Sequence, residues 1–399
     1  MYWQNLEYSK KQINLVKIFS QIKLGDKMAK FKIMSVFGTR PEAIKMAPLV
    51  KLLEKDDYFD SKVLVTAQHR QMLDSVLEIF DIHPDFDLDI MKHGQTIGDI
   101  TTRILNGVLE VIKNDFRPDL ILVHGDTSTS FSAALAAFYE KVPVGHVEAG
   151  LRTGNIYSPF PEEMNRKLIG TLATYHFSPT TSNYQNLVKE NINEKNIVIT
   201  GNTVIDALHL VVDKNYDFSK KSDFDGIDLS KKILLMTCHR RENWGEPMSQ
   251  IFRAVNRVAD EYDDIQVVYP VHLNPDIVKK ANEMLISKNI RLIKPLEYVE
   301  FANLIAKSHF VLTDSGGLQE EAPSIGKPVL VLRTETERPE AVEAGTVKVV
   351  GVDEQTVYKN IKQLLDDKNT YDSMANAVNP YGDGTASQKI IDFIKKIGK

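Results

Sequence analysis

The chain has 399 residues, of which 43% are hydrophobic and 26% charged, values typical of a globular protein long enough for two domains. Its net charge of -5 and sequence pI of about 6.1 give no reason to expect nucleic-acid binding, and no run of about 18 uncharged apolar residues predicts a membrane span. The single cysteine, Cys238, excludes an internal disulfide and favours a reducing compartment, so we expect a cytoplasmic protein.

Residues 1–27 carry scattered lysines and only short apolar runs. They lack the uninterrupted apolar core and the small-residue cleavage site of a signal peptide. We assign this N-terminal extension no function. Met1 and Met28 both remain candidate start residues.

A first series of alternating strands and helices follows the extension. The apolar run at 31–37 predicts a strand, a glycine turn at Gly38 comes next, and Pro41 suits the first turn of a helix. Such a turn presents backbone N–H groups to an anion, and Arg40 and Lys45 add positive charge nearby. A purely structural turn explains the pattern equally well.

Acidic residues follow two later strands of this series. Asp126 comes after the apolar run at 120–124 and precedes a helix, so a helix N-cap and a catalytic group are equally good interpretations. Glu148 ends the predicted strand at 142–147 and lies in a stretch rich in glutamate, arginine, glycine and proline. Since ligands bind at the carboxyl ends of parallel strands, we interpret Glu148 as a site residue.

A polar segment at 213–230 precedes a second series of strands and helices. The alternation predicts an α/β protein with two Rossmann-like parallel-sheet domains facing a central cleft. We place the N-terminal domain at 28–200 and the C-terminal domain at 201–379. The C-terminal helix at 380–399 is expected to pack back on the first domain.

The second series offers a candidate nucleotide site. Asp314 to Gly317 form a glycine turn before a helix that carries Glu320 and Glu321, and Arg338 follows downstream. This set favours a nucleotide diphosphate, because a carboxylate in that position accepts hydrogen bonds from ribose hydroxyls. The glycine spacing differs from that of dinucleotide sites and no P-loop is present, so we expect no dinucleotide cofactor and no NTP hydrolysis. The histidines show no metal-ligand spacing, so we expect no metal.

Six ordered motifs resemble those of the non-hydrolysing UDP-N-acetylglucosamine 2-epimerase family, from about residue 31 to the C-terminus. The resemblance implies a GT-B fold, a homodimer, no cofactor, and interconversion of UDP-GlcNAc with UDP-ManNAc that supplies ManNAc units for cell-surface polysaccharide. The motifs are Gly38-Thr39-Arg40-Pro41-Glu42, His124-Gly125-Asp126-Thr127, His146-Val147-Glu148-Ala149-Gly150-Leu151-Arg152-Thr153, Pro161-Glu162-Glu163, His239-Arg240-Arg241-Glu242-Asn243 and Asp314-Ser315-Gly316-Gly317.

The resemblance also implies a mechanism, in which UDP is eliminated across C1–C2 to give 2-acetamidoglucal and then adds back with the opposite configuration at C2. Glu148 and Glu162 match the acid/base positions, and Asp126 is a third such group or their orienter. His239 matches a histidine that contacts the diphosphate. The matching positions that hold the UDP-sugar are Arg40, Lys45, Phe301, Ser315, Gly316, Gly317, Glu321 and Arg338.

Bacterial members of this family can bind a second UDP-GlcNAc as an activator. Gln68, Gln71, Arg240 and His272 match that site. Members of the family carry an arginine in the segment aligned with 91–96, where this chain has Gly94. We therefore expect a weakened contact with the activator.

Three alternative functions share parts of this pattern. A hydrolysing epimerase would release UDP and free ManNAc, and a GT-B glycosyltransferase would share the fold and the UDP site. A nucleotide-sugar sensor without turnover would keep Ser315 to Gly317 and Glu321 but lose the acids. Asp126, Glu148 and Glu162 are all present, which disfavours the sensor.

Overall fold

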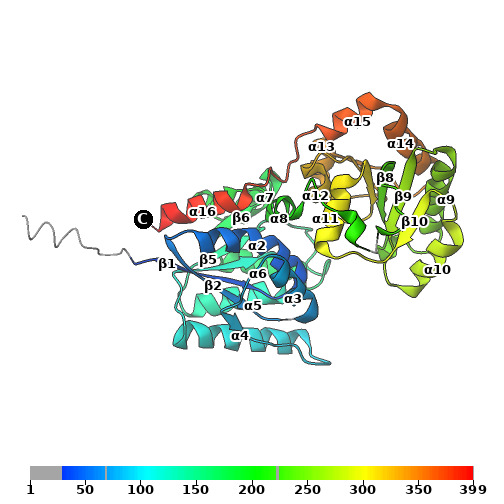
Figure 1. Cartoon of the computed structure of the whole chain (residues 1–399). Coiled ribbons are helices and arrows are strands. Elements are labelled where there is room, and N and C mark those ends of the chain that lie inside the picture. Colours follow the sequence, from blue (N-terminus) through cyan, green and yellow to red (C-terminus); the bar gives the residue numbers. More distant parts are fainter. Residues whose placement is uncertain (1–28, 68–69, 222–223, 399) are drawn as a thin grey trace, which may run out of the picture.

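The computed structural model describes residues 29–67, 70–221 and 224–398. The predicted extension at 1–27 and the candidate activator residue Gln68 lie outside these residues. Figure 1 shows two α/β domains side by side, joined where α8 and the chain leading to α16 pass between them.

Each domain is built on a parallel sheet. The first sheet has seven strands in the order β3-β2-β1-β4-β5-β6-β7, and the second has six in the order β10-β9-β8-β11-β12-β13. The strands are β1 (Phe31–Phe37), β2 (Phe59–Val65), β3 (Phe86–Asp87), β4 (Leu120–His124), β5 (Val144–Val147), β6 (Tyr175–Ser178), β7 (Ile197–Ile199), β8 (Lys232–Thr237), β9 (Ile265–Pro270), β10 (Ile290–Ile293), β11 (Phe310–Thr313), β12 (Val329–Val331) and β13 (Val347–Val349).

Helices connect the strands and cover both faces of each sheet. They are α2 (Arg40–Lys55), α3 (Arg70–Ile79), α4 (Ile97–Asn114), α5 (Ser128–Tyr139), α6 (Glu162–Leu172), α7 (Thr181–Lys189), α8 (Thr203–Val211), α9 (Glu246–Glu261), α10 (Pro275–Met284), α11 (Tyr298–Lys307), α12 (Leu318–Ser324), α13 (Pro339–Glu343), α14 (Glu354–Asp366), α15 (Lys368–Ala375) and α16 (Ala386–Ile397).

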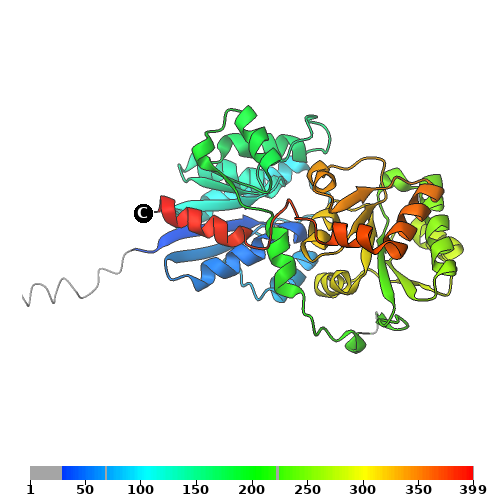
Figure 2. The same ribbon diagram turned by 90° about the horizontal axis from the view of Figure 1, so that it is seen from above.

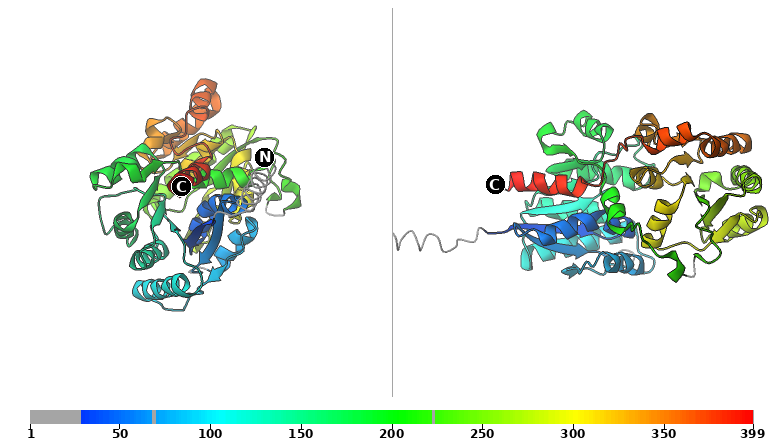
Figure 3. Two further views of the ribbon diagram at one scale, coloured as in Figure 1. Left: turned by 90° about the vertical axis from the view of Figure 1, so that its left-hand side faces the viewer. Right: turned by 45° about the horizontal axis from the view of Figure 1, so that its top comes forward.

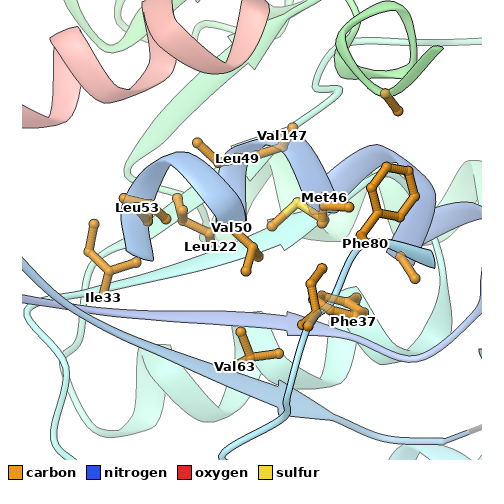
Figure 4. Packing of buried hydrophobic residues seen from close by; sticks show 14 of the residues in the cluster. Ile33, Phe37, Met46, Leu49, Val50, Leu53, Val63, Phe80, Leu122 and Val147 are labelled. Carbon is orange, nitrogen blue, oxygen red and sulfur yellow. The ribbon is translucent and has the colours of Figure 1, made fainter. Parts of the chain in front are cut away.

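Burial on both faces explains the continuous apolar strands. β4 reads LILVH and is buried at every position, as expected of a central parallel strand. Figure 4 shows one face of the first sheet, where Ile33 and Phe37 of β1 pack under Met46 and Leu53 of α2. On the opposite face, α4 and α5 pack against alternate residues of the same strands. The second sheet is covered in the same way by α9, α10 and α14 on one face and α8, α11 and α12 on the other.

The last helix belongs to the first domain in space although it ends the chain. Ile390, Ile391 and Ile394 of α16 join the hydrophobic core around α2, and Figures 2 and 3 show α16 lying along that domain. The Asp206 carboxylate on α8 accepts hydrogen bonds from the backbone N–H groups of Ala386 (3.2 Å) and Ser387 (2.7 Å). This contact fixes the start of α16.

The strand order reverses once in each sheet, between β1 and β4 in the first and between β8 and β11 in the second. Ligands of open α/β sheets bind at such points, outside the carboxyl ends of the strands. Two Rossmann-like domains with these paired switch points constitute a GT-B fold, as predicted. No helix within the described residues is long and apolar enough to cross a bilayer.

Candidate active site

The backbone N–H groups of the turn after β1 are hydrogen-bonded to a nearby carboxylate. The buried Glu42 carboxylate accepts hydrogen bonds from the N–H groups of Gly38 (3.1 Å) and Thr39 (2.8 Å). It also accepts one from the Thr127 hydroxyl (2.6 Å), which ties the turn to the loop after β4. These two N–H groups are therefore paired with Glu42, as a structural role for the turn requires. Arg40, beside this turn, forms an ion pair of 3.3 Å with Glu297 of the second domain.

Glu148 lies directly after β5 and forms the centre of a partly buried charge cluster. Its carboxylate forms an ion pair with Lys45 of α2, and its Oε2 lies 3.2 Å from Nε2 of His124 at the end of β4. Burial acts to raise the pKa of Glu148, but the charges of Lys45 and His124 outweigh burial and hold it well below its usual range. Burial acts to lower the pKa of Lys45, but the ion pair with Glu148 acts against burial, and the pKa of Lys45 is raised. The structure therefore places Lys45, expected at the UDP-sugar, against the predicted base.

Asp126 lies on the other side of the β4 loop and forms an ion pair with Arg166. Its Oδ2 is 2.8 Å from Nε and 2.7 Å from Nη2 of that guanidinium. The side chain that caps α5 is Thr127, so the N-cap interpretation of Asp126 is wrong. Arg166 also binds the fully buried Glu163, which accepts the N–H groups of Thr153 and Gly154. Glu163 thus fixes the backbone of the loop at Thr153 and Gly154.

Glu162, the neighbour of Glu163, begins α6 and is half-buried. It is the predicted acid/base residue of this helix. Successive residues on a helix point about 100° apart, so only one of the two glutamates can enter the core.

The second domain brings Arg338 to the acid cluster. Arg338 forms an ion pair with the buried Glu320, whose other oxygen accepts a hydrogen bond of 2.6 Å from Asn202. Arg338 and Glu148 line the same small cavity of about 20 Å³. Burial lowers the pKa of Arg338, but Glu320 dominates and raises it, so this cation persists at any physiological pH.

Three of the predicted UDP-sugar residues line a cavity of about 290 Å³ in the second domain, together with the predicted catalytic histidine. His239, Phe301, Ser315 and Glu321 all line it. Burial, followed by the charge of Glu320, raises the pKa of Glu321 to about 7. The carboxylate is suited to a ribose, the aromatic ring to a base, and the turn that contains Ser315 to a phosphate.

Asp314 is fully buried and binds the backbone beside this cavity. Its Oδ2 accepts the N–H groups of His239 and Arg240, each at 2.8 Å, and its Oδ1 lies 3.3 Å from Nδ1 of His239. A Cβ on Gly316 would lie 3.9 Å from Nη2 of both Arg240 and Arg338. Two guanidiniums therefore flank the glycine turn where a phosphate is expected, with Gly317 following as the N-cap of α12.

The candidate activator residues lie in different places. His272 stacks on His239, with ring centroids 5.8 Å apart and an interplanar angle of 10°, and lines the same cavity. Gln71 is exposed on α3, and Gly94 lies in an exposed turn with a φ of 74°. In the described part of the chain, no group of three potential metal-binding side chains occurs.

A further cavity of about 360 Å³ opens between the domains. Residues of the 151–159 loop and Arg166 line one side, and Arg333 to Pro339 line the other. Arg338 thus faces both this space and the Glu148 cluster.

Sequence reasoning did not single out His124 or Asn202 as site residues, and it offered Glu320 only as an alternative to Glu321 at the ribose. His124 ends β4 and Asn202 caps α8. The position of His124 at the carboxyl end of a central strand was a usable signal. The Asn202 contact with Glu320 joins residues 118 positions apart, a pairing that local sequence does not encode.

The fold and the buried acid cluster between facing switch points define an enzyme of the GT-B class. The family model described as UDP-N-acetylglucosamine 2-epimerase matches residues 51–395. The chain belongs to the UDP-N-acetylglucosamine 2-epimerase family.

Individual relatives agree with this assignment. The chain is 57% identical over 366 residues to the UDP-N-acetylglucosamine 2-epimerase of Bacillus subtilis (strain 168), covering 92% of this chain and 95% of that protein. It matches the crystal structure of a putative UDP-N-acetylglucosamine 2-epimerase from Listeria monocytogenes with a TM-score of 0.87 and 53% identity, covering 92% and 96% of the two chains. The UDP-GlcNAc 2-epimerase from Neisseria meningitidis bound to UDP-GlcNAc matches with a TM-score of 0.81 and 50% identity, covering 92% and 100%.

Proposed function

We propose that this protein interconverts UDP-GlcNAc and UDP-ManNAc by inverting C2, without releasing the sugar by hydrolysis. The observation that carries the proposal is the position of Arg338. Its guanidinium lies near Gly316 at the predicted phosphate turn and lines a cavity with Glu148. A UDP-sugar with its nucleotide in the second-domain cavity would therefore present its sugar to the acid cluster of the first domain.

In the proposed elimination, a carboxylate removes the proton from C2. The C2–H electron pair forms the C1–C2 double bond, and the C1–O bond breaks with its electrons remaining on the β-phosphate of UDP. Glu148 suits the base because Lys45 keeps it ionised, and general base catalysis contributes about 10²- to 10⁴-fold in rate. His239, Arg40 and Arg338 stabilise the departing diphosphate.

In the return step, an acid delivers a proton to the opposite face of C2, and the β-phosphate oxygen of UDP bonds again to C1. Inversion requires groups on both faces of the sugar. Glu162 and Asp126 are the further carboxylates at the same edge of the sheet, and Arg166 fixes the orientation of Asp126. The lining of the second-domain cavity supports two further contacts, Glu321 with the ribose and Phe301 with the uracil.

Product analysis tests this function. The purified protein is incubated with UDP-GlcNAc, without added NAD or metal, and followed by proton and phosphorus NMR. We expect UDP-ManNAc and little free ManNAc. Free ManNAc with UDP would assign the chain to the hydrolysing class. Tight UDP binding without turnover would instead support a GT-B transferase or a sensor.

We further propose a cytoplasmic homodimer that supplies ManNAc units for cell-surface polysaccharide. The lone cysteine is buried, and Phe138 and Tyr139 at the end of α5 are more than half exposed. Light scattering should give twice the chain mass of 45.1 kDa. A mass of one chain would contradict the dimer.

A second UDP-GlcNAc is the proposed activator. Arg240 and His272 lie in or beside the nucleotide cavity, and Gln71 is exposed. If the activator binds, the rate should depend on UDP-GlcNAc with a Hill coefficient above one. His272→Ala should lower that Hill coefficient to one. Hyperbolic kinetics in the wild type would contradict the activator.

A further inference from the structure

Glu340 joins three separate segments of the chain. It lies on α13, and its Oε1 accepts a hydrogen bond from the Ser182 hydroxyl and lies 3.1 Å from Oγ1 of Thr180. Its Oε2 accepts a hydrogen bond of 3.2 Å from the Tyr381 hydroxyl. Thr180 and Ser182 begin α7 of the first domain, whereas α13 belongs to the second. The carboxylate therefore connects the two domains directly.

The same short segment carries Arg338. This residue is the N-cap of α13, two positions before Glu340, and α13 is only five residues long. A constraint on Glu340 therefore constrains Arg338. The cavity that Arg338 shares with Glu148 also has Glu340 and Tyr381 in its wall, and its volume of about 20 Å³ holds no more than a water or two.

Charge supports a permanent contact. Burial acts to raise the pKa of Glu340, but the hydroxyl of Ser182, its own backbone N–H and the hydroxyls of Thr180 and Tyr381 outweigh burial and lower it. The acceptor is thus ionised at neutral pH. Hydrogen bonds to a charged acceptor are about twice as strong as neutral ones.

We propose that Glu340 is a positioning residue: by binding the start of α7, it holds the domains at the separation that places Arg338 beside Glu148. The inference rests on the proposed epimerase function, in which Arg338 stabilises the diphosphate while Glu148 removes the C2 proton. Glu340 itself touches neither the cavity for the nucleotide nor the predicted acid/base groups by hydrogen bond.

The test compares Glu340→Ala and Ser182→Ala, which break the contact from opposite sides. Glu343→Ala is the matched control, because Glu343 is exposed on the same helix. We expect each disruptive variant to lower kcat about 10- to 100-fold, since displacing a reacting group by about 1 Å costs up to about 10²-fold. The affinity for UDP should fall by much less than kcat, because most of the residues that line its cavity lie within the second domain and only the contacts of Arg40 and Arg338 depend on the domain separation.

The double variant separates positioning from general damage. If both residues act through one contact, Ser182→Ala with Glu340→Ala should be no slower than the slower single variant. Glu340→Gln keeps an acceptor oxygen and should recover part of the rate. Multiplying effects, an unchanged kcat in both single variants, or an equal loss of UDP affinity would each overturn the proposal.

Hydrogen exchange keeps the two proposals distinguishable. Glu340→Ala should speed amide exchange at both 180–184 and 338–343, whether or not the wild type turns over UDP-GlcNAc. Faster exchange with an inactive wild type would refute the proposed function but support the contact. Unchanged exchange in both segments would refute the contact. If Glu340→Ala fails to fold, Ser182→Ala answers the same question from the first domain.

Discussion

Glu148 combines an unusual backbone with an unusual environment. Its φ is 61°, in the left-handed region that side chains other than glycine rarely adopt. Such a conformation costs on the order of 1 kcal/mol or more and persists where the surroundings hold it. Here the ion pair with Lys45 and the imidazole of His124 hold the carboxylate. A carboxylate on a strained backbone at a strand end is consistent with a catalytic base.

Lys45→Met should impair the base without removing it. With Lys45 gone, burial is the larger influence and the pKa of Glu148 rises, so the ionised base is lost first at low pH. We expect kcat/KM to fall more at pH 6 than at pH 9, with the rising limb of its pH profile moved upward. Lys55→Met, which is exposed on the same helix, is the control. An unshifted profile in Lys45→Met would contradict this role.

Glu321 should make UDP binding depend on pH. Its pKa of about 7 means that this proposed ribose acceptor becomes ionised between pH 6 and 8. Ionised carboxylates accept hydrogen bonds more strongly, so affinity should rise as the pH increases, by roughly tenfold from the change in ionised fraction. Calorimetry of UDP binding to the wild type and to Glu321→Gln measures this. The ionisation of UDP is common to both proteins, so parallel pH dependences would refute the role of Glu321.

At the scale of secondary-structure elements, the strongly periodic segments were predictable. β1 spans Phe31–Phe37 as predicted, because seven apolar-rich residues end at a glycine turn. β3 was missed, since Phe86 and Asp87 alone form no pattern. The edge at which Asp126 and Glu148 meet followed from strand direction.

The pairing of site residues was less accessible. Lys45 and Glu148 are 103 positions apart, and which of Glu320 and Glu321 faces the nucleotide cavity depends on the rotation of a short helix. The N-cap alternative for Asp126 was wrong because Thr127 caps α5 instead. Such choices depend on packing between elements, which local sequence does not encode.

The attachment of α16 should depend on Asp206. Its buried carboxylate accepts the N–H groups of Ala386 and Ser387, so Asp206→Ala leaves these donors unpaired. Losing such a capping contact costs roughly 1–2 kcal/mol. Chemical denaturation should show that loss in the free energy of unfolding. Lys396→Ala, exposed on the same helix, should change it by less than about 0.5 kcal/mol; equal effects would contradict the capping role.

At the scale of the whole molecule, the chain crosses between the domains twice, and the crossings contact each other. The N–H of Asn202 donates to the carbonyl of Tyr381 at 2.7 Å, and Asn202 also binds Glu320. Figure 1 shows both crossings on the same side of the domain interface. This connection places the two switch points opposite each other, so the site exists only in the assembled pair of domains.

The ion pair between Arg40 and Glu297 should matter for ligand binding more than for stability. Glu297 is largely exposed, and exposed pairs contribute about 0–1 kcal/mol. Glu297→Ala should therefore leave the melting temperature nearly unchanged and keep or improve UDP affinity, because Arg40 is released. Arg40→Ala should weaken UDP binding by about tenfold or more, as expected for the loss of a charge-assisted contact. Similar UDP affinities in both variants would contradict a phosphate role for Arg40.

The central claim is that the Glu148 cluster removes the C2 proton of a UDP-sugar held by the second domain. We would incubate the wild type and Glu148→Gln with UDP-GlcNAc in deuterium oxide and follow C2 by proton NMR. The account predicts UDP-ManNAc carrying deuterium at C2, and a loss of about 10²-fold or more in both exchange and product formation in Glu148→Gln. UDP-ManNAc that retains its C2 proton, or exchange at the wild-type rate in Glu148→Gln, would contradict it.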